Sequence, residues 1–169
     1  MESVAGCCRG YLFRQTYNIR SILQRRYVVQ EIFDTEVTFL SSLNQVKQLF
    51  QLPLANSQNA ERPILPRLLV RSLFLNIDEV ITASCVNANI FQQQATSWYY
   101  DSRFGASMLR ALRNMLPLVE YTLQWEYQKR ALHQAYKNTL FKQFVQLQIA
   151  AESLGKLSLE DLLIMSVPR

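Results

Sequence analysis

The most constraining feature of this 169-residue chain is a long helical periodicity over residues 18–51. Apolar side chains recur there every three or four positions, the spacing that places them on one side of a helix. The stripe consists of Val29, Ile32, Phe39, Leu43, Val46 and Phe50, widened by Val28, Phe33, Val37 and Leu40. The opposite side carries Gln24, Glu31, Thr35, Thr38, Ser42 and Gln45. The pattern predicts one amphipathic helix of roughly nine turns.

The remainder of the chain shows the same period and no convincing strand. Further helical stretches are predicted over residues 66–94, 106–116, 118–134 and 137–150. Residues 53–63 and 92–105 are predicted as connections, and Pro117 as a point where a helix kinks or restarts. Ser158 with Asp161 three positions later is a capping pattern for a last helix. Four glycines and five prolines are too few for a turn-rich β-sandwich. The fold class predicted is therefore all-α, a bundle of antiparallel helices.

Composition narrows the setting of the protein. Hydrophobic residues make up 49% of the chain and charged residues 18%, which is not the composition of a disordered protein. The net charge of +5 suits an acidic partner or a membrane surface without requiring nucleic acid. Cys7, Cys8 and Cys85 lack metal-binding spacing and are interpreted as inert thiols of a reducing compartment. No apolar run is long enough to span a membrane and no secretory signal is visible, so a cytoplasmic location is expected.

The residues needed for covalent catalysis are sparse. His133 is the single histidine, so histidine triads and histidine clusters lack a second member. No glycine-rich phosphate loop occurs, and Glu160 and Asp161 are adjacent, so they do not face each other on a helix. We expect no cofactor and no metal site. The sequence favours a helical module that works by surface contact.

Three segments, in order, resemble the Dbl-homology domain of Rho-family guanine-nucleotide exchange factors. Residues 28–36 (VVQEIFDTE) are similar to the first conserved helix of that family, residues 73–80 (LFLNIDEV) to the second segment, and residues 157–169 (LSLEDLLIMSVPR) to the third. Residues 116–121 and 141–145 also fit the middle helices of the family. The resemblance covers about residues 25–169, and it implies an elongated antiparallel helix bundle of the Dbl-homology type.

The resemblance implies that the chain binds a Rho-family small GTPase and promotes release of GDP by reshaping its switch loops. Glu31 matches the family glutamate that contacts the first switch, and it lies with Thr35 on the polar side of the predicted helix. Met165 stands where the family has a lysine that meets the second switch. The predicted GTPase-binding residues are Glu31, Thr35 and Met165. Glu36 is in step with the apolar stripe, so it is interpreted as a buried structural carboxylate with an Arg or Lys partner.

Two further segments are interpreted as structural. Asn76, Asp78 and Glu79 are expected to support helix packing, and Leu162, Leu163 and Ile164 to pack inward.

The family continues beyond the equivalent of Arg169 with a long last helix, so the chain is expected to be an amino-terminal portion of a larger module. An exchange factor truncated before that helix is expected to be weak or inactive. The alternative is a non-catalytic binding or regulatory module derived from such a domain.

Residues 1–24 are interpreted as a basic lead-in ahead of the partial Dbl-homology domain at residues 25–169. Residues 9–14 (RGYLFR) are similar to the second half of a calmodulin-binding IQ motif, whereas Ala5 replaces the glutamine of the first half. The half-matched motif leaves two interpretations open: an ordinary basic lead-in, which is favoured, and a segment that binds a calmodulin-like protein. An IQ segment ahead of a Dbl-homology domain is the arrangement of the Ras guanine-nucleotide-releasing factors.

Overall fold

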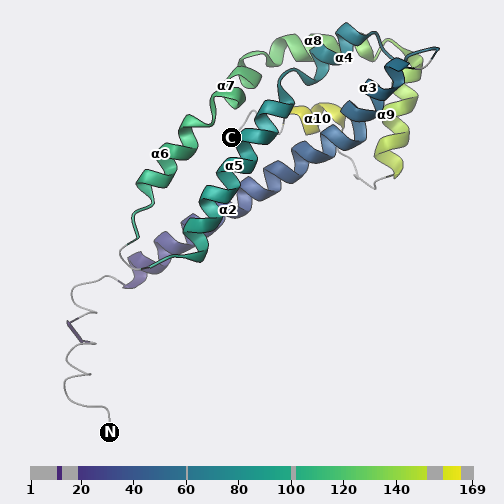
Figure 1. Ribbon diagram of the computed structural model, residues 1–169. Coiled ribbons are helices and arrows are strands. Elements are labelled where there is room, and N and C mark those ends of the chain that lie inside the picture. The colour runs from purple at the N-terminus through teal and green to yellow at the C-terminus, as the bar shows by residue number, and fades with distance from the viewer. Residues whose placement is uncertain (1–10, 13–18, 60, 100–101, 152–157, 165–169) are drawn as a thin grey trace.

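The computed structural model describes residues 11–12, 19–59, 61–99, 102–151 and 158–164. Within these ranges every regular element is helical and no strand occurs, so the prediction of an all-α fold is confirmed. The elements are α2 (Ile19–Val46), η1 (Lys47–Gln51), α3 (Leu52–Asn56), η2 (Ser57–Asn59), α4 (Arg67–Phe74), α5 (Ile77–Thr96), α6 (Gly105–Arg113), α7 (Leu116–Leu123), α8 (Trp125–Ala135), α9 (Thr139–Ala151) and α10 (Leu159–Ile164). Figure 1 shows an elongated bundle in which α2 and α5 run alongside each other.

The contact between α2 and α5 buries the apolar stripe that the sequence predicts. Val29, Phe39, Leu43 and Val46 are all buried, whereas Val28 and Val37, which were expected to widen the stripe, are exposed. A small cluster of Ile90, Phe91 and Ala111, with Ile32, Phe33, Phe104 and Met108 packed against it, fills the bundle near the first half of α2. A much larger cluster fills the other end. Burial of such side chains stabilises the fold by about 1.5–3 kcal/mol each.

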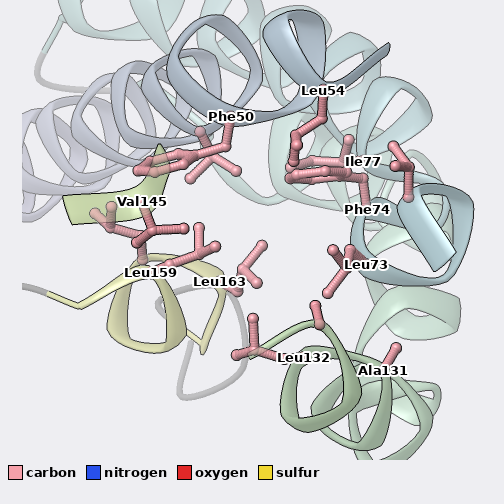
Figure 2. Close-up of a cluster of buried hydrophobic side chains, with 14 of the residues drawn as sticks. Phe50, Leu54, Leu73, Phe74, Ile77, Ala131, Leu132, Val145, Leu159 and Leu163 are labelled. Carbon is pink, nitrogen blue, oxygen red and sulfur yellow. The ribbon is translucent and has the colours of Figure 1, made fainter. Parts of the chain in front are cut away.

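The short helix α10 lies inside the larger cluster. Figure 2 shows Leu159 and Leu163 of α10 among Phe50, Leu73, Leu132 and Val145, which come from four other elements. Leu159, Leu162 and Leu163 are buried and Ile164 is half-buried, so the prediction that this segment packs inward is confirmed. Because α10 also contacts α2 and α8, it connects the first long helix with the later helices in one core.

A buried polar chain connects α10 to three other helices. Gln128 of α8 is fully buried and donates through Nε2 to the carbonyl oxygen of Leu73 (2.6 Å) and to the hydroxyl of Tyr121 (2.9 Å). The Tyr121 hydroxyl donates in turn to the carbonyl oxygen of Leu163 (3.3 Å). Buried polar groups need such partners, because an unpaired one costs the full desolvation free energy. The chain therefore fixes how α4, α7, α8 and α10 meet.

Several predicted helix boundaries are wrong. The predicted helix 66–94 is two helices, α4 and α5, with Leu75 between them at φ 45° and ψ −128°. The backbone leaves the helix there without a glycine or proline, and apolar spacing continues across the break, so no sequence signal marks it. The helix predicted over 118–134 likewise breaks at Gln124, between α7 and α8. Pro117 stands in the first turn of α7, where a missing N–H costs nothing, so the predicted restart is confirmed.

The connection predicted to begin at Pro53 is also wrong in its bounds. The chain passes from α2 through the π-helical turn η1 into α3, so Pro53 lies in the first turn of a helix that continues to Asn56. The 3₁₀ turn η2 then extends to Asn59. The second predicted connection begins later than expected, because α5 continues to Thr96. Breaks and extensions of this kind depend on tertiary packing that local periodicity does not report.

The strained backbone at Leu75 leads to a test of stability. Leu75 packs partly buried against the larger cluster, and a non-glycine residue at such a positive φ stores about 1–3 kcal/mol of strain. Leu75→Ala removes packing and keeps the strain, whereas Leu75→Gly removes both and adds an entropy cost of about 0.5–1 kcal/mol. We expect the glycine variant to be more stable than the alanine variant by about 1 kcal/mol in urea unfolding followed by circular dichroism. An alanine variant of equal or higher stability would contradict this account.

Candidate functional site

The exposed side of α2 forms a polar surface without a deep cavity. Its side chains line a shallow hollow and come from successive turns of one helix: Tyr27, Gln30, Glu31, Asp34, Thr35 and Thr38. Each of these residues is exposed, while Val29 and Glu36 on the other side of the helix are buried. We call this set the α2 polar face. Its exposure follows directly from the amphipathic pattern, because the apolar stripe turns the opposite side to solvent.

Most donors of the α2 polar face are already used within the helix. The Thr35 hydroxyl donates to the Glu31 carbonyl oxygen (2.5 Å) and the Thr38 hydroxyl to the Asp34 carbonyl oxygen (2.8 Å). Gln30 donates through Nε2 to Oδ1 of Asp34 (2.9 Å). These are local contacts one turn apart, as serine and threonine side chains commonly make in helices. The hydroxyl oxygens of Thr35 and Thr38 can still accept hydrogen bonds from solvent or from another molecule, so the surface offers more acceptors than donors.

Glu31 is the carboxylate of this surface that is left without a partner. Among the residues that the structure describes, none donates a hydrogen bond to its side chain or forms an ion pair with it. The adjacent Asp34 accepts from Gln30, so the two carboxylates differ in what they have available. An exposed carboxylate with free oxygens can accept charge-assisted hydrogen bonds from N–H or hydroxyl groups of another molecule. The structure thus brings Glu31 and Thr35 together, one turn apart on the same exposed face.

Glu36 lies on the opposite side of α2 and is buried, as predicted. Ser84 of α5 donates to its Oε1 at 2.5 Å, so a serine hydroxyl partners this carboxylate across the helix pair. Ser84 is one partner of Glu36, and the Arg or Lys partner expected from the sequence stays a prediction. The α2–α5 contact therefore contains a polar pair among apolar side chains, and that pair aligns the two helices lengthwise. Glu36 belongs to the core and not to the exposed surface.

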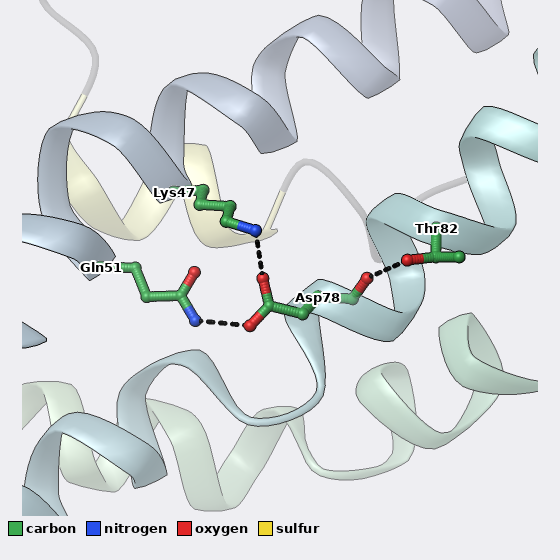
Figure 3. A network of polar contacts seen from close by, with 4 residues as sticks. All are labelled: Lys47, Gln51, Asp78 and Thr82. Carbon is green, nitrogen blue, oxygen red and sulfur yellow. Dashed lines mark hydrogen bonds and ion pairs between the residues drawn. The ribbon is translucent and has the colours of Figure 1, made fainter.

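A second polar contact connects the π-helical turn η1 to the start of α5. In Figure 3, Lys47 Nζ lies 2.7 Å from Oδ1 of Asp78, and Gln51 donates through Nε2 to Oδ2 at 3.0 Å. Both hydrogen bonds favour the charged carboxylate, and that from Lys47 is the largest influence, so the pKa of Asp78 lies below its usual value. Asn76 donates through Nδ2 to the carbonyl oxygen of Pro117 (2.9 Å). Asn76 and Asp78 thus contact other elements, in agreement with the structural interpretation, and both Asp78 and Glu79 are exposed.

The last predicted site residue, Met165, lies outside the described residues, directly after α10. The helix before it is well anchored. Ser158 caps it, since its backbone N–H and hydroxyl both donate to Oδ2 of Asp161, at 2.8 and 2.7 Å, and its hydroxyl accepts from the Asp161 N–H. These hydrogen bonds hold the pKa of Asp161 below its usual value. Lys129 of α8 lies 3.8 Å from Oε1 of Glu160.

The remaining sequence hypotheses concern the histidine, the cysteines and the IQ-like segment. His133 is exposed in the last turn of α8, beside Lys129, Arg130 and Lys137. Cys85 is exposed on α5, and Cys7 and Cys8 lie outside the described residues. The IQ-like residues 9–14 are described only at Tyr11 and Leu12, so a calmodulin-like ligand stays a prediction. None of the described helices has the length and apolar composition that crossing a membrane requires.

Sequence reasoning singled out Glu31 and Thr35 and passed over three of their neighbours. Tyr27, Gln30 and Asp34 line the same hollow, but they were not proposed as site residues. Their positions were readable, because Tyr27, Glu31 and Thr35 are spaced by four, as are Gln30, Asp34 and Thr38. What the spacing could not show is which side chains are occupied. The Gln30–Asp34 contact, which leaves Glu31 as the open acceptor, is visible only with side chains in place.

The fold and this surface define an elongated, all-α domain that presents an acceptor-rich helix face. Residues 28–169 match the RhoGEF domain model, and the chain therefore belongs to the RhoGEF domain family. It is 24% identical over 150 residues to Protein ECT2 of Homo sapiens, an alignment that spans 86% of this chain and 16% of ECT2. A solved structure concerning the PH and C1 domains of the Vav1 exchange factor shares the fold, with a TM-score of 0.73 and 18% identity. It covers 86% of this chain and 38% of that one.

The contact between Lys47 and Asp78 predicts a pH-dependent contribution to stability. A carboxyl group with a lowered pKa in the folded state stabilises the fold above its unfolded pKa, and the contribution is lost as pH falls through the folded pKa. Asp78→Asn should therefore destabilise the protein at pH 7, by at most about 1 kcal/mol for so exposed a pair. The difference from wild type should shrink below about pH 4, near the ordinary pKa of aspartate.

Urea unfolding at a series of pH values measures this difference. In a Lys47→Met background, Asp78→Asn should have a smaller effect and a weaker pH dependence, because the main cause of the lowered pKa is gone. A difference between Asp78→Asn and wild type that stays constant from pH 7 to about pH 3 would rule out this linkage.

Proposed function

We propose that this chain is a guanine-nucleotide exchange factor domain that acts on a Rho-family small GTPase through the α2 polar face. Membership of the RhoGEF domain family over residues 28–169 supports the class of activity. The observation that carries the choice of surface is Glu31, an exposed carboxylate with no partner among the described residues and with a match to the family's GTPase-contacting glutamate. The proposal includes a cytoplasmic location, since a GTPase partner of this kind belongs there and the free thiol of Cys85 is compatible with a reducing compartment.

Exchange of this kind needs no covalent chemistry. A factor that binds the nucleotide-free GTPase more tightly than the loaded form shifts the population toward nucleotide release. Glu31 would contribute by accepting hydrogen bonds from the first switch loop in the conformation that has lost its nucleotide. The Thr35 hydroxyl donates within its own helix, so it would act as a second acceptor one turn away. The scaffold suits this role, because the Glu36–Ser84 pair joins α2 to α5 and the Lys47–Asp78 pair joins the following turn η1 to α5.

The role of Glu31 is tested by Glu31→Ala. Hydrogen bonds to charged groups contribute about 1.5–3 kcal/mol, so binding to nucleotide-free GTPase and stimulated release of a fluorescent GDP analogue should each fall roughly 10- to 100-fold. Both measurements use the full chain, and each is made with Rho, Rac and Cdc42. Thermal stability should not change, because the side chain is exposed.

Glu126→Ala is the matched control, since Glu126 is an exposed glutamate on α8, outside the α2 polar face. It should bind and exchange as wild type does. Equal losses in the Glu31 and Glu126 variants would point to a general charge effect and not to a contact at Glu31, and unchanged binding in Glu31→Ala would remove the glutamate from the interface.

A binding module without exchange activity is the second candidate, and Met165 favours it. A thioether supplies neither the positive charge nor the hydrogen-bond donors that the family lysine brings to the second switch. Met165→Lys should therefore strengthen GTPase binding and raise stimulated GDP release severalfold, because it restores the charged side chain that the family has at this position. Met165→Gln, which is polar but uncharged, is the comparison. If wild type binds nucleotide-free GTPase but neither it nor Met165→Lys releases GDP, the module is non-catalytic.

A further inference from the structure

An apolar stripe on α6 and α7 has no covering element among the described residues. It consists of Leu109, Leu112, Leu116, Val119 and Leu123, whose exposed fractions range from 51% to 79%. The intervals are three, four, three and four, which is the heptad spacing of helices that pair along a seam. Contiguous large apolar side chains at the surface mark interaction sites, whereas isolated ones are ordinary.

The stripe is continuous although α6 and α7 are separate helices. Asn114 N–H donates to the Ala111 carbonyl oxygen (3.0 Å) and Met115 N–H to the Leu112 carbonyl oxygen (3.1 Å), so a tight turn carries the chain from one helix into the next. Both helices pack on α5, and their inward residues Ala111 and Tyr121 are almost completely buried. The stripe residues lie on the exposed sides of the two helices, and at the turn Leu116 and Arg113 also line an open hollow with Asp78, Glu79, Thr82 and Val86 of α5. Figure 1 shows α6 and α7 following one another along the edge of the bundle.

One charge of each sign flanks the stripe. Arg113 and Glu120 are both exposed and stand seven residues apart, which is the same position of two successive heptads. Within the part of the chain that the structure describes, no residue makes an ion pair with either of them. The positions on the other flank, Met108, Met115 and Thr122, carry no charge.

We propose that a second copy of this chain covers the stripe, with the two α6–α7 segments antiparallel about a two-fold axis. In antiparallel pairs, residues of the same flank face each other. When Leu112 lies opposite Leu123 of the second copy and Leu116 opposite Val119, the Arg113 of each copy faces the Glu120 of the other. The contact is self-complementary, as a two-fold interface must be, and it contains the charge pair twice.

The charges discriminate against the other arrangements. Sliding the pair by one heptad, so that Leu112 lies opposite Leu116 of the second copy, would bring Arg113 against Arg113. A parallel pair would set the charged flank against the uncharged flank and give no attraction between Arg113 and Glu120. Complementary charge thus favours the antiparallel pair of two copies in the register that sets Leu112 opposite Leu123. The apolar stripe in this pair spans roughly 21 Å of helix.

Charge reversal tests the pairing. Sedimentation equilibrium of the full chain should show a monomer–dimer equilibrium, and R113E or E120R should each weaken the dimer about tenfold, because every reversal acts twice. The double variant R113E/E120R restores opposite charges and should return the dissociation constant to within about threefold of wild type. A wild-type protein that stays monomeric at about 100 µM overturns the proposal. So does a double variant as weak as the single ones.

A matched pair of leucines tests the apolar stripe. Leu123→Lys should abolish the dimer, while Leu68→Lys on α4 should leave it intact, since the two leucines are 79% and 77% exposed and only Leu123 belongs to the stripe. Circular dichroism spectra of both variants should match wild type. Monomeric protein that instead co-sediments with vesicles of phosphatidylserine and phosphatidylcholine, and loses that binding with Leu123→Lys, would show that a membrane covers the stripe and overturn the proposal.

Discussion

The packing of α2 along α5 is the interaction on which the rest of the structure depends. It buries Val29, Phe39, Leu43 and Val46 and thereby turns Glu31 and Thr35 outward on the same helix. The Glu36–Ser84 pair favours one lengthwise position of the two helices, since a buried carboxylate that slides away from this donor loses a hydrogen bond. The exposed acceptors are thus held by the core behind them, without any loop whose ordering would cost entropy on binding.

The fold class and the face of the first helix were predictable because they depend on local periodicity. A stripe sustained from Val29 to Phe50 allows one helix and one buried side, and Glu36 stood out as a carboxylate inside that stripe. The breaks at Leu75 and Gln124 were not predictable, because both lie within continuous helical spacing and neither has a glycine or proline. Leu75 keeps its strained conformation because its surroundings hold it, and no sequence window contains those surroundings.

The candidate site shows the same division between local pattern and tertiary contact. Glu31 and Thr35 could be placed on an exposed face from spacing alone. Side-chain geometry determines that Gln30 donates to Asp34 and leaves the Glu31 carboxylate open. It also determines that Ser84 donates to Glu36. The polar chain from Gln128 through Tyr121 to Leu163 was invisible in the sequence, because its contacts to Leu73 and Leu163 join residues that are far apart along the chain.

The π-helical turn η1 determines how far the α2 polar face is rotated about the helix axis relative to the larger cluster. Val46, Phe50 and Leu54 are all fully buried at intervals of four, although two such steps in an α-helix would rotate a side chain by about 80° away from the starting direction. The wider turn at Lys47–Gln51 absorbs that rotation and keeps the three in line. One residue gained or lost in η1 would turn the α2 polar face by about 100° relative to the core around α10. The length of this five-residue turn therefore sets the direction in which Glu31 faces, with no contact between them.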